Sequence, residues 1–580
     1  MAENKESKLR TIIDNMTIEE KAGQCLVVDF TGISITPHLI DLIERCNCAG
    51  LRVQSDCRIK SIYHSGAVTA KKSKERSFRH PKDGCKDLAY GQPAPSCRAS
   101  EYASVLNKVK QIAMNRKHGI PLHITLDQEG AGYENFICGN VRQFPSPMGV
   151  AATNDSDLAY KAYRVMARQL KLSGFSWIHS PVLDVNTNPL NPEIGIRAFS
   201  DTSETVAKFG MAMLKAFQAE KIITTGKHFP GRGESAIDAH ADLPTIDISR
   251  DELMNVHLAP YKALIAEGLP SVMLAHTIYP ALDSDPVPAT TSRKIITGVL
   301  REELGFEGAI TTDNMLMSGL IKKYEILEAS ILALKGGATL ILPRVESPLI
   351  NEIYDGIVAA IKSGRLPEKL IDEAIYHNLS VKYDYGLFDD GGIVDPAKAD
   401  AYQDDADAQA VEAEVGQKSV TLLRDDLNIL PISPDKNVLL IDQTGGAQVN
   451  FNNFSCHPGI FWEQLLEISK NVRCVELKGS KIPDDEEEQR VLRRMEEADI
   501  IIAANYEIHR QEKFNTALLE KIKDKGKPMI VVTNSPYKTS DAFETVLVLW
   551  TDAPASTKAA GEIIFGKRDF QAKMPIARYK

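Results

Sequence analysis

The stretch IITTGKHFPGRGESAIDAH, residues 222–240, decides how the rest of the chain is interpreted. It opens with the apolar run Ile222–Thr225, which is typical of a buried strand. Glycines and a proline follow at once, so we expect the strand to end and a loop to begin. Four ionisable groups lie on or around that loop: Lys227, His228, Asp238 and His240. Such groups beside a rigid strand are typical of a catalytic loop, although a polar surface loop has a similar composition.

Short apolar runs like this one recur along the N-terminal part of the chain. The eight runs are Cys25–Phe30, Gly50–Val53, Leu122–Leu126, Ser176–Ser180, Ile222–Thr225, Ser271–Ala275, Gly308–Thr312 and Ala338–Leu342. Segments of helical periodicity separate most of them, namely Leu158–Leu172, Ser203–Ala219, Val256–Ala266, Ser292–Leu304 and Ile326–Lys335. Strands that alternate with helices indicate a parallel sheet, and eight such units predict a closed (β/α)8 TIM-type barrel.

The length of 580 residues exceeds what one hydrophobic core usually supports, so we expect two domains. A second set of strands follows the barrel, at Val438–Asp442, Val472–Leu477, Ile500–Ala504, Met529–Thr533 and Val546–Leu549. Helical stretches separate them, which predicts a smaller, five-stranded, three-layer α/β/α domain. We therefore predict a barrel over residues 1–385, an acidic, alanine-rich linker over 386–410 and the second domain over 411–580.

One connection in the barrel is unusually long. More than sixty residues, Gln54–Pro121, separate the second run from the third, with a helix expected near Ser100–Arg116. An insertion of this size in a barrel loop is a candidate lid or wall of a binding site. A decorative loop has the same sequence character.

The composition of the chain excludes several classes of function. The net charge of −10 argues against a general nucleic-acid or anionic-membrane binder, and no apolar stretch has the length of a membrane span. The first eight residues are polar and carry no apolar signal core. Nine cysteines are scattered without metal-site spacing, so free thiols in a reducing cytoplasm are the simplest account. We expect a cytoplasmic enzyme that acts on small molecules.

The predicted carboxyl ends of the barrel strands carry polar side chains, and this is where barrel enzymes perform their chemistry. These side chains are Asp127, His179, Asp184, Lys227, His228, His276 and Asp313. No pattern of metal ligands accompanies them, so we expect chemistry without metal or cofactor. Carboxylates and histidines suit glycoside hydrolysis, in which a retaining enzyme needs a carboxylate nucleophile and a second group that protonates the leaving oxygen.

The same residues carry a family resemblance. Lys227–Gly231 with Asp238–His240 resembles the K-H-F-P-G…D-[SA]-H signature of glycoside hydrolase family 3, in its β-N-acetylglucosaminidase branch of the cell-wall recycling type. Further blocks agree in the same order: Asp127–Gly130, Phe144–Met148, Pro181–Asn186, Asn188-Pro189, Ile194–Phe199, Met273–His276, Tyr279-Pro280, Leu300-Arg301 and Thr312–Met317. The second domain resembles that of two-domain members, with weaker motifs.

The resemblance implies roles for individual residues. Asp313 would be the nucleophile, and His240 the general acid/base, oriented and tuned by Asp238. A histidine titrates near neutral pH, so it can donate a proton and later accept one. The predicted substrate-binding residues are Asp127, Arg197, Lys227, His228 and His276. The chain departs from the family after D-Q-E-G, where Ala131-Gly132-Tyr133 replaces Gly-Gly-Arg, and Asn314 replaces an acidic residue or serine.

The predicted function is that of a retaining, exo-acting β-N-acetylglucosaminidase on fragments derived from peptidoglycan or chitin. Three alternatives stay open. A neutral histidine does not repel an anion, so phosphate could replace water as the acceptor, helped by Arg232, in a β-N-acetylglucosaminide phosphorylase. The chain could be another β-glycosidase of the same family. It could also be a barrel that has lost catalysis and only binds glycan.

Overall fold

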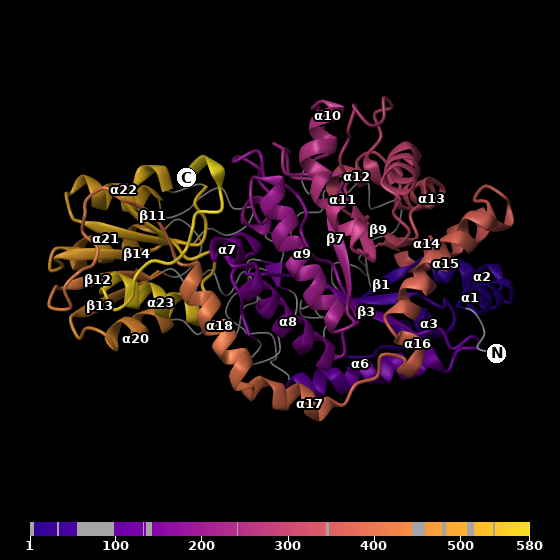
Figure 1. Ribbon diagram of the computed structural model, residues 1–580, viewed down its shortest axis with the longest axis horizontal. Helices are drawn as coiled ribbons and strands as arrows, with labels where there is room; N and C mark the ends of the chain where they lie inside the picture. The colour runs from indigo at the N-terminus through magenta and orange to yellow at the C-terminus, as the bar shows by residue number, and fades with distance from the viewer. Residues whose placement is uncertain are drawn as a thin grey trace.

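The computed structural model describes residues 5–31, 34–54, 98–131, 133–134, 142–239, 242–343, 347–442, 459–477, 483–506, 516–537 and 540–579. They form two α/β units that lie side by side, the larger from the N-terminal part of the chain (Figure 1). Most of the predicted lid, residues 55–97, lies outside the described residues. The helix predicted at its end is confirmed as α6 (Ala99–Met114).

The larger unit is the predicted barrel. Its parallel strands are β1 (Val27–Thr31), β2 (Gly50–Gln54), β3 (His123–Leu126), β6 (Trp177–Ile178), β7 (Ile223–Phe229), β8 (Ser271–Leu274), β9 (Ala309–Asn314) and β10 (Leu340–Leu342). They pair in chain order, and a parallel bridge between Leu26 and Ile341 joins the first strand to the last. The sheet is therefore nearly closed, and all eight strands predicted from apolar runs are present.

Helices surround this sheet in an outer layer. The predicted helices are found as α8 (Ser156–Leu172), α9 (Ser203–Ala219), α11 (Ala259–Ala266), η5 (Lys294–Glu303) and α13 (Ile326–Gly336). Capping residues set some of the boundaries: the Asp155 side chain accepts hydrogen bonds from Asp157 N and Leu158 N at the start of α8. Among the described helices, none has both the length and the apolar character required to cross a bilayer.

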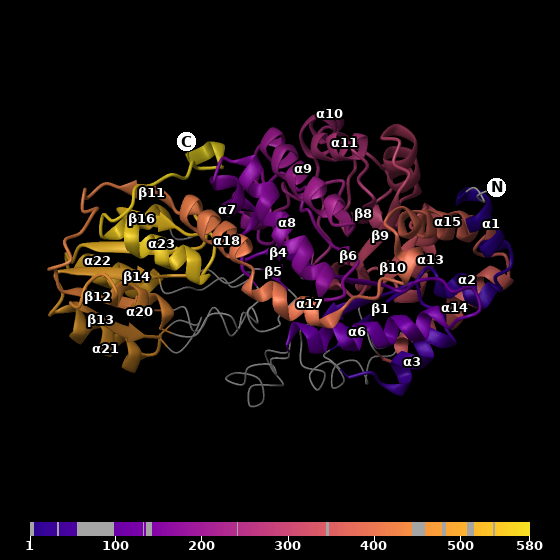
Figure 2. The same ribbon diagram turned by 60° about the horizontal axis from the view of Figure 1, so that its bottom comes forward.

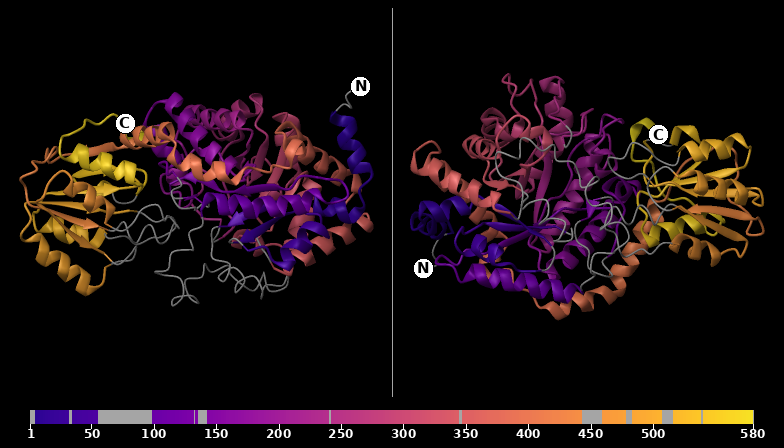
Figure 3. Two further views of the ribbon diagram at one scale, coloured as in Figure 1. Left: turned by 90° about the horizontal axis from the view of Figure 1, so that it is seen from below. Right: turned by 180° about the vertical axis from the view of Figure 1, so that it is seen from behind.

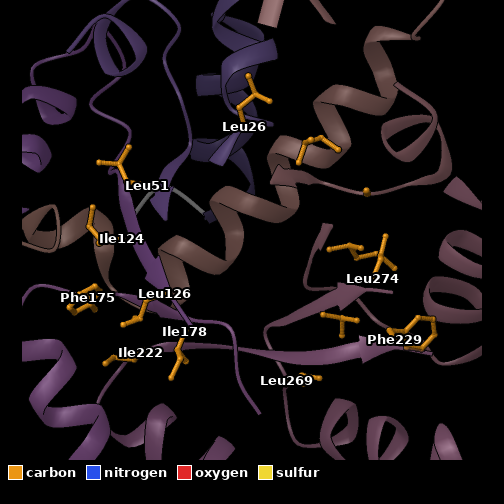
Figure 4. Packing of buried hydrophobic residues seen from close by; sticks show 14 of the residues in the cluster. Leu26, Leu51, Ile124, Leu126, Phe175, Ile178, Ile222, Phe229, Leu269 and Leu274 are labelled. Carbon is orange, nitrogen blue, oxygen red and sulfur yellow. The ribbon is translucent and has the colours of Figure 1, made fainter. Parts of the chain in front are cut away.

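Both faces of the barrel strands are buried, which explains why their sequences are apolar throughout. Leu26, Leu51 and Ile124 belong to the large core beneath the helices (Figure 4). The intervening residues, such as Val27, form a separate cluster with Trp177 and Ile223. Side chains therefore fill the barrel interior around Val27, Trp177 and Ile223. A pocket can form only beyond this cluster, toward an end of the barrel.

The second unit contains a six-stranded sheet in the order β11-β16-β15-β14-β12-β13. Five strands match the prediction: β12 (Val438–Asp442), β13 (Val472–Glu476), β14 (Ile500–Ala504), β15 (Met529–Thr533) and β16 (Thr545–Val548). The prediction of five strands was one short, because β11 (Thr421–Asp425) adds an antiparallel edge to β16. Helices α20 (Ile460–Leu466) and α23 (Pro554–Ile564) cover one face, and α21 (Asp485–Met495) and α22 (Thr516–Asp524) the other.

The segment predicted as a linker is largely helical, with α16 (Leu387–Asp390), α17 (Pro396–Ala401) and the start of α18 (Ala406–Ser419). Helices α17 and α18 run along the edge of the barrel toward the second unit (Figure 2). In both views of Figure 3 the second unit lies at one end of the barrel. An apolar cluster joins the units, centred on the fully buried Trp550. A Cβ on Gly149 would lie 2.3 Å from Trp550 Cβ, so glycine permits this contact.

The barrel interior predicts a test of the packing. A methyl group on Gly50 of β2 would lie 2.1 Å from His123 Nε2, much closer than van der Waals contact with this fully buried ring. We expect Gly50→Ala to destabilise the protein by about 1–3 kcal/mol, because the strand or the ring must move. Thermal unfolding followed by circular dichroism measures this change.

The control is Gly298→Ala in η5, where a Cβ meets nothing within 4 Å. We expect no loss of stability there, since alanine favours helix. Equal melting temperatures for the two variants would contradict the packing described above.

Candidate active site

A polar pocket lies at the carboxyl ends of the barrel strands, where the sequence predicted the site. It is lined by Arg52, Asp127, Glu193, Arg197, Lys227, His228, Met273, Asp313, Asn314 and Leu342. The pocket thus brings together these predicted site residues: Asp127, Arg197, Lys227, His228 and Asp313. Strand β7 extends beyond the predicted run Ile222–Thr225 to Phe229, so Lys227 and His228 lie near the carboxyl end of the strand.

Asp127 follows β3 and is held by cations from neighbouring strands. Lys227 Nζ donates to Asp127 Oδ1 over 2.8 Å, and Arg52 of β2 donates to Asp127 Oδ2. Burial alone would raise the pKa of Asp127, but Lys227 and Arg52 hold it well below the usual range. His179 Nδ1 lies 3.8 Å from Asp127 Oδ1, and burial lowers the pKa of His179 to about 3. Asp127 is therefore a fixed carboxylate beside a neutral imidazole.

Glu129 links the lysine to an arginine from another loop. Arg197 donates to both carboxylate oxygens of Glu129, each over 2.8 Å, and Lys227 Nζ lies 2.6 Å from Glu129 Oε1. Burial opposes ionisation of Glu129, but Arg197 and Lys227 lower its pKa. Lys227 therefore bridges two buried carboxylates, and its position is fixed before any substrate binds.

Glu193 and Arg232 connect this network to Asp313. Arg232 is 1% exposed and pairs with Glu193 Oε2, while its Nη1 lies 3.9 Å from Asp313 Oδ2. Arg197 Nη1 lies 4.0 Å from Glu193 Oε1 on the other side. Asp313 thus faces a buried guanidinium whose main partner is another carboxylate.

Asp313 is positioned near the end of β9, with 17% of its side chain exposed. The backbone amide of Asn314 donates to Asp313 Oδ1 over 2.7 Å. This bond and the cation of Arg232 favour an ionised carboxylate. A partly exposed, ionised carboxylate in a polar pocket is suited to nucleophilic attack on a bound sugar.

His228 is oriented from behind the pocket. Its Nδ1 lies 2.8 Å from Asp184 Oδ2, and Asp184 also accepts a hydrogen bond from the backbone amide of Arg232 over 2.6 Å. Asp184 is fully buried, which opposes its ionisation, but His228 and the Arg232 amide lower its pKa. The ring of His228 is thereby fixed while it lines the pocket.

His276 lies just past the end of β8, where the sequence predicted it. It is fully buried and is not among the residues that line the pocket. Its Nδ1 lies 2.7 Å from Thr290 Oγ1, and its Nε2 lies 2.9 Å from the backbone oxygen of Asn314. Both ring nitrogens thus contact protein groups, so we interpret His276 as a support for the segment that follows Asp313 and not as a sugar ligand.

The predicted acid/base loop is only partly described. His240 lies outside the described residues, and Asp238 is half-buried. Ala239 N lies 3.4 Å from Glu193 Oε2, which brings the loop to the pocket, and Gly319 N donates to Ala239 O over 3.1 Å. Asn191 Nδ2 donates to the carbonyl oxygens of Arg232 and Gly233. The first half of the loop is therefore held in place.

Arg52, Glu129 and Glu193 are the pocket residues and partners that the sequence did not single out. Glu129 belongs to the D-Q-E-G block, and Glu193 precedes the block that contains Arg197. Arg52 could have been found from the sequence, because it lies inside an apolar run that is typical of a buried strand. A charged side chain in such a run needs a partner. Within the described ranges, no group of three or more His, Cys, Asp or Glu side chains could hold a metal ion.

Comparisons with known proteins agree with this geometry. Residues 91–381 match the Glycosyl hydrolase family 3 N terminal domain, and residues 420–580 match the Glycosyl hydrolase family 3 C-terminal domain. A solved structure described as a glycoside hydrolase family 3 β-N-acetylglucosaminidase from a Paenibacillus species is similar over 97% of this chain and 99% of that one. Its TM-score is 0.81 at 25% identity.

Two relatives are more similar in sequence over shorter stretches. The chain is 34% identical to a protein named Beta-hexosaminidase A from Pseudoalteromonas piscicida over 42% of this chain and 43% of that protein. It is 33% identical to a protein named Beta-hexosaminidase from Nitrosomonas eutropha over 46% of this chain and 78% of that protein. The chain thus spans less than half the length of the first relative and most of the second.

The buried lysine predicts a pH-dependent loss of stability. The folded pKa values of Asp127 and Glu129 lie below those of unfolded chains, about 3.9 and 4.3. Their ionised forms therefore stabilise the fold above about pH 4, and this contribution is lost as the pH falls through the folded values. Lys227→Met leaves two buried carboxylates near each other, which we expect to cost about 3–5 kcal/mol at pH 7.5.

The deficit of Lys227→Met should shrink at pH 5, because a carboxylate that has lost its cation binds a proton more readily. Thermal unfolding at both pH values measures it. The control is Lys215→Met, whose exposed ion pair with Glu267 contributes at most about 1 kcal/mol. A Lys227→Met deficit that is small, or equal at the two pH values, would contradict the paired arrangement.

Proposed function

Since the chain belongs to glycosyl hydrolase family 3, we propose that it is a retaining, exo-acting β-N-acetylglucosaminidase. The substrates would be fragments derived from peptidoglycan or chitin that end in β-linked N-acetylglucosamine. The observation that carries the proposal is the place of Asp313, a partly exposed carboxylate among buried, paired charges at the barrel mouth. The relatives named Beta-hexosaminidase and the similar β-N-acetylglucosaminidase structure support the choice of sugar.

In the proposed reaction, Asp313 attacks the anomeric carbon while the imidazolium of His240 protonates the departing glycosidic oxygen. A covalent ester between the sugar and Asp313 forms, and the leaving alcohol departs. The now neutral His240 then removes a proton from water, which attacks the same carbon and releases N-acetylglucosamine and the Asp313 carboxylate. Asp238 would favour the charged imidazole and fix its orientation.

The other predicted pocket residues would bind the non-reducing sugar. Asp127 offers carboxylate oxygens, while Lys227, His228 and Arg197 offer donors to sugar hydroxyls. Their partners hold each group in place, so little conformational entropy is lost when the sugar binds. A pocket, in contrast to an open groove, suits removal of one terminal sugar at a time.

The contacts of Arg232 favour water over phosphate as the acceptor. In a phosphorylase this guanidinium would be expected to contact the phosphate. Here it is buried, pairs with Glu193 and faces Asp313. Its charge is thus directed to two carboxylates of the protein. We therefore propose hydrolysis as the main reaction and treat phosphorolysis as an outcome that the assay must detect.

The proposal predicts turnover of p-nitrophenyl N-acetyl-β-glucosaminide well above that of the plain β-glucoside. Asp313→Asn keeps the shape of the side chain and removes the nucleophile, so kcat should fall on the order of 10³-fold or more. Asp242→Asn is the control, since Asp242 is an exposed carboxylate on the loop that carries Asp238. Release of nitrophenol measures all three proteins.

Added phosphate should leave the rate unchanged and yield N-acetylglucosamine, not the sugar 1-phosphate. A sugar 1-phosphate as main product would make the chain a phosphorylase. Preferred cleavage of the glucoside would reject the proposed substrate. Failure of the wild-type protein to cleave either glycoside, while it still binds N-acetylglucosamine, would favour a barrel that only binds glycan.

A further inference from the structure

The connection between β6 and α9 faces both the pocket and the second unit. Glu193 and Arg197 line the pocket, where Arg197 holds Glu129 and Glu193 holds Arg232. Their apolar neighbours in the sequence turn the other way: Ile194 and Ala198 are buried in one cluster with Val548, Trp550 and Ile576 of the second unit. The turn that presents two pocket charges is therefore packed against a different domain.

Tyr537 of the second unit lies directly on this turn. Asn186 Nδ2 donates to the Tyr537 hydroxyl over 3.1 Å, and Asn186 Oδ1 accepts from the backbone amide of Gly195 over 3.2 Å. The Tyr537 ring also covers Gly195, since a Cβ built there would lie 3.9 Å from Tyr537 Cδ2. Gly195 begins the short helix η2 (Gly195–Arg197) and has φ of 47°, a conformation that favours glycine.

We propose that Tyr537 is a positioning residue for the barrel pocket: through Asn186 it fixes the turn at Gly195 that presents Arg197 and Glu193. The inference rests on the proposed function for its kinetic consequence. The hydroxyl of Tyr537 holds the amide of Asn186, and the amide oxygen of Asn186 holds the start of η2. The second unit thus acts on the pocket although none of its described residues is in the lining.

Different residues are proposed to bind the sugar and to react with it. Arg197 is proposed to contact the sugar, whereas Asp313 is held on β9 by the Asn314 amide and Arg232. When the Tyr537 hydroxyl is removed, Asn186 loses one partner and the turn at Gly195 becomes less restricted. Sugar binding should weaken most, because Arg197 is proposed to contact the sugar directly, whereas Glu193 reaches Asp313 only through Arg232 and the Asn314 amide still holds the nucleophile. A residue that only stabilises the interface would lower the melting temperature without a selective change in KM.

The test compares Tyr537→Phe with Ser200→Ala. Phenylalanine keeps the ring over Gly195 and removes only the hydroxyl. Ser200→Ala removes a different hydrogen bond across the same interface, from Ser200 Oγ to Pro575 O over 2.6 Å. We expect Tyr537→Phe to raise KM for the p-nitrophenyl N-acetylglucosaminide about 3- to 10-fold with kcat within about 2-fold of wild type. Ser200→Ala should leave KM unchanged.

Asn186→Ala supplies a second arm. If Tyr537 acts through Asn186, then Tyr537→Phe should add little to the KM of Asn186→Ala, so the two effects are not additive. Three results would overturn the inference. The KM of Tyr537→Phe could equal that of wild type, or it could change only as much as the KM of Ser200→Ala. The effects of Tyr537→Phe and Asn186→Ala on KM could also be additive.

Amide hydrogen exchange tests the same inference without substrate. The peptide spanning residues 187–199 should exchange faster in Tyr537→Phe than in wild type or Ser200→Ala, because the Gly195 amide is held less tightly. Unchanged exchange would overturn the positioning role even if KM moved. If the wild-type protein does not cleave the N-acetylglucosaminide, the proposed function fails, and the exchange experiment still decides whether Tyr537 fixes this turn.

Discussion

A continuous chain of alternating charges across the barrel mouth is the interaction on which the rest of this structure depends. It runs from Asp29 through Arg52, Asp127, Lys227, Glu129, Arg197, Glu193 and Arg232 to Asp313. Five carboxylates and four cations are joined in this way, and all but Asp313 are almost fully buried. A buried charge is tolerated only when it is paired, so each member between the two ends depends on both of its neighbours. The extra carboxylate, at the exposed end, is the one proposed to react.

Because of these ion pairs, the geometry of the pocket depends on the fold of the whole barrel. Asp127 and Lys227 are 100 residues apart in sequence, and Arg52 and Asp127 are 75 apart, yet each pair is in contact. Such pairs form only when the barrel strands lie in their native order and register. The second unit extends the same dependence, because it packs against the turn that carries Glu193 and Arg197. The pocket is therefore organised before substrate arrives, which lowers the cost of binding.

The sequence predicted much of this arrangement, and the parts that it missed have a common cause. Apolar runs located all eight barrel strands, because strands buried on both faces have few polar residues. Residues after those runs, such as Asp127 and Asp313, were correctly placed at one mouth. Pairing could not be predicted: nothing local to Glu193 indicates Arg232 as its partner, and nothing local to His276 shows that its nitrogens bind Thr290 and Asn314. The exposed edge strand β11 was missed because it lacks a continuous apolar run.

The central claim is that Asp313, the exposed end of this chain of charges, forms a covalent bond to the sugar. Incubation with an activated 5-fluoro derivative of N-acetyl-β-glucosamine, which slows release of a glycosyl-enzyme, tests it most directly. Peptide mapping by mass spectrometry then locates the label. The account predicts one equivalent of sugar attached to the peptide that contains Asp313, with no label in Asp313→Asn. Label on a different carboxylate, or complete turnover of an inhibitor that never attaches to the protein, would contradict it.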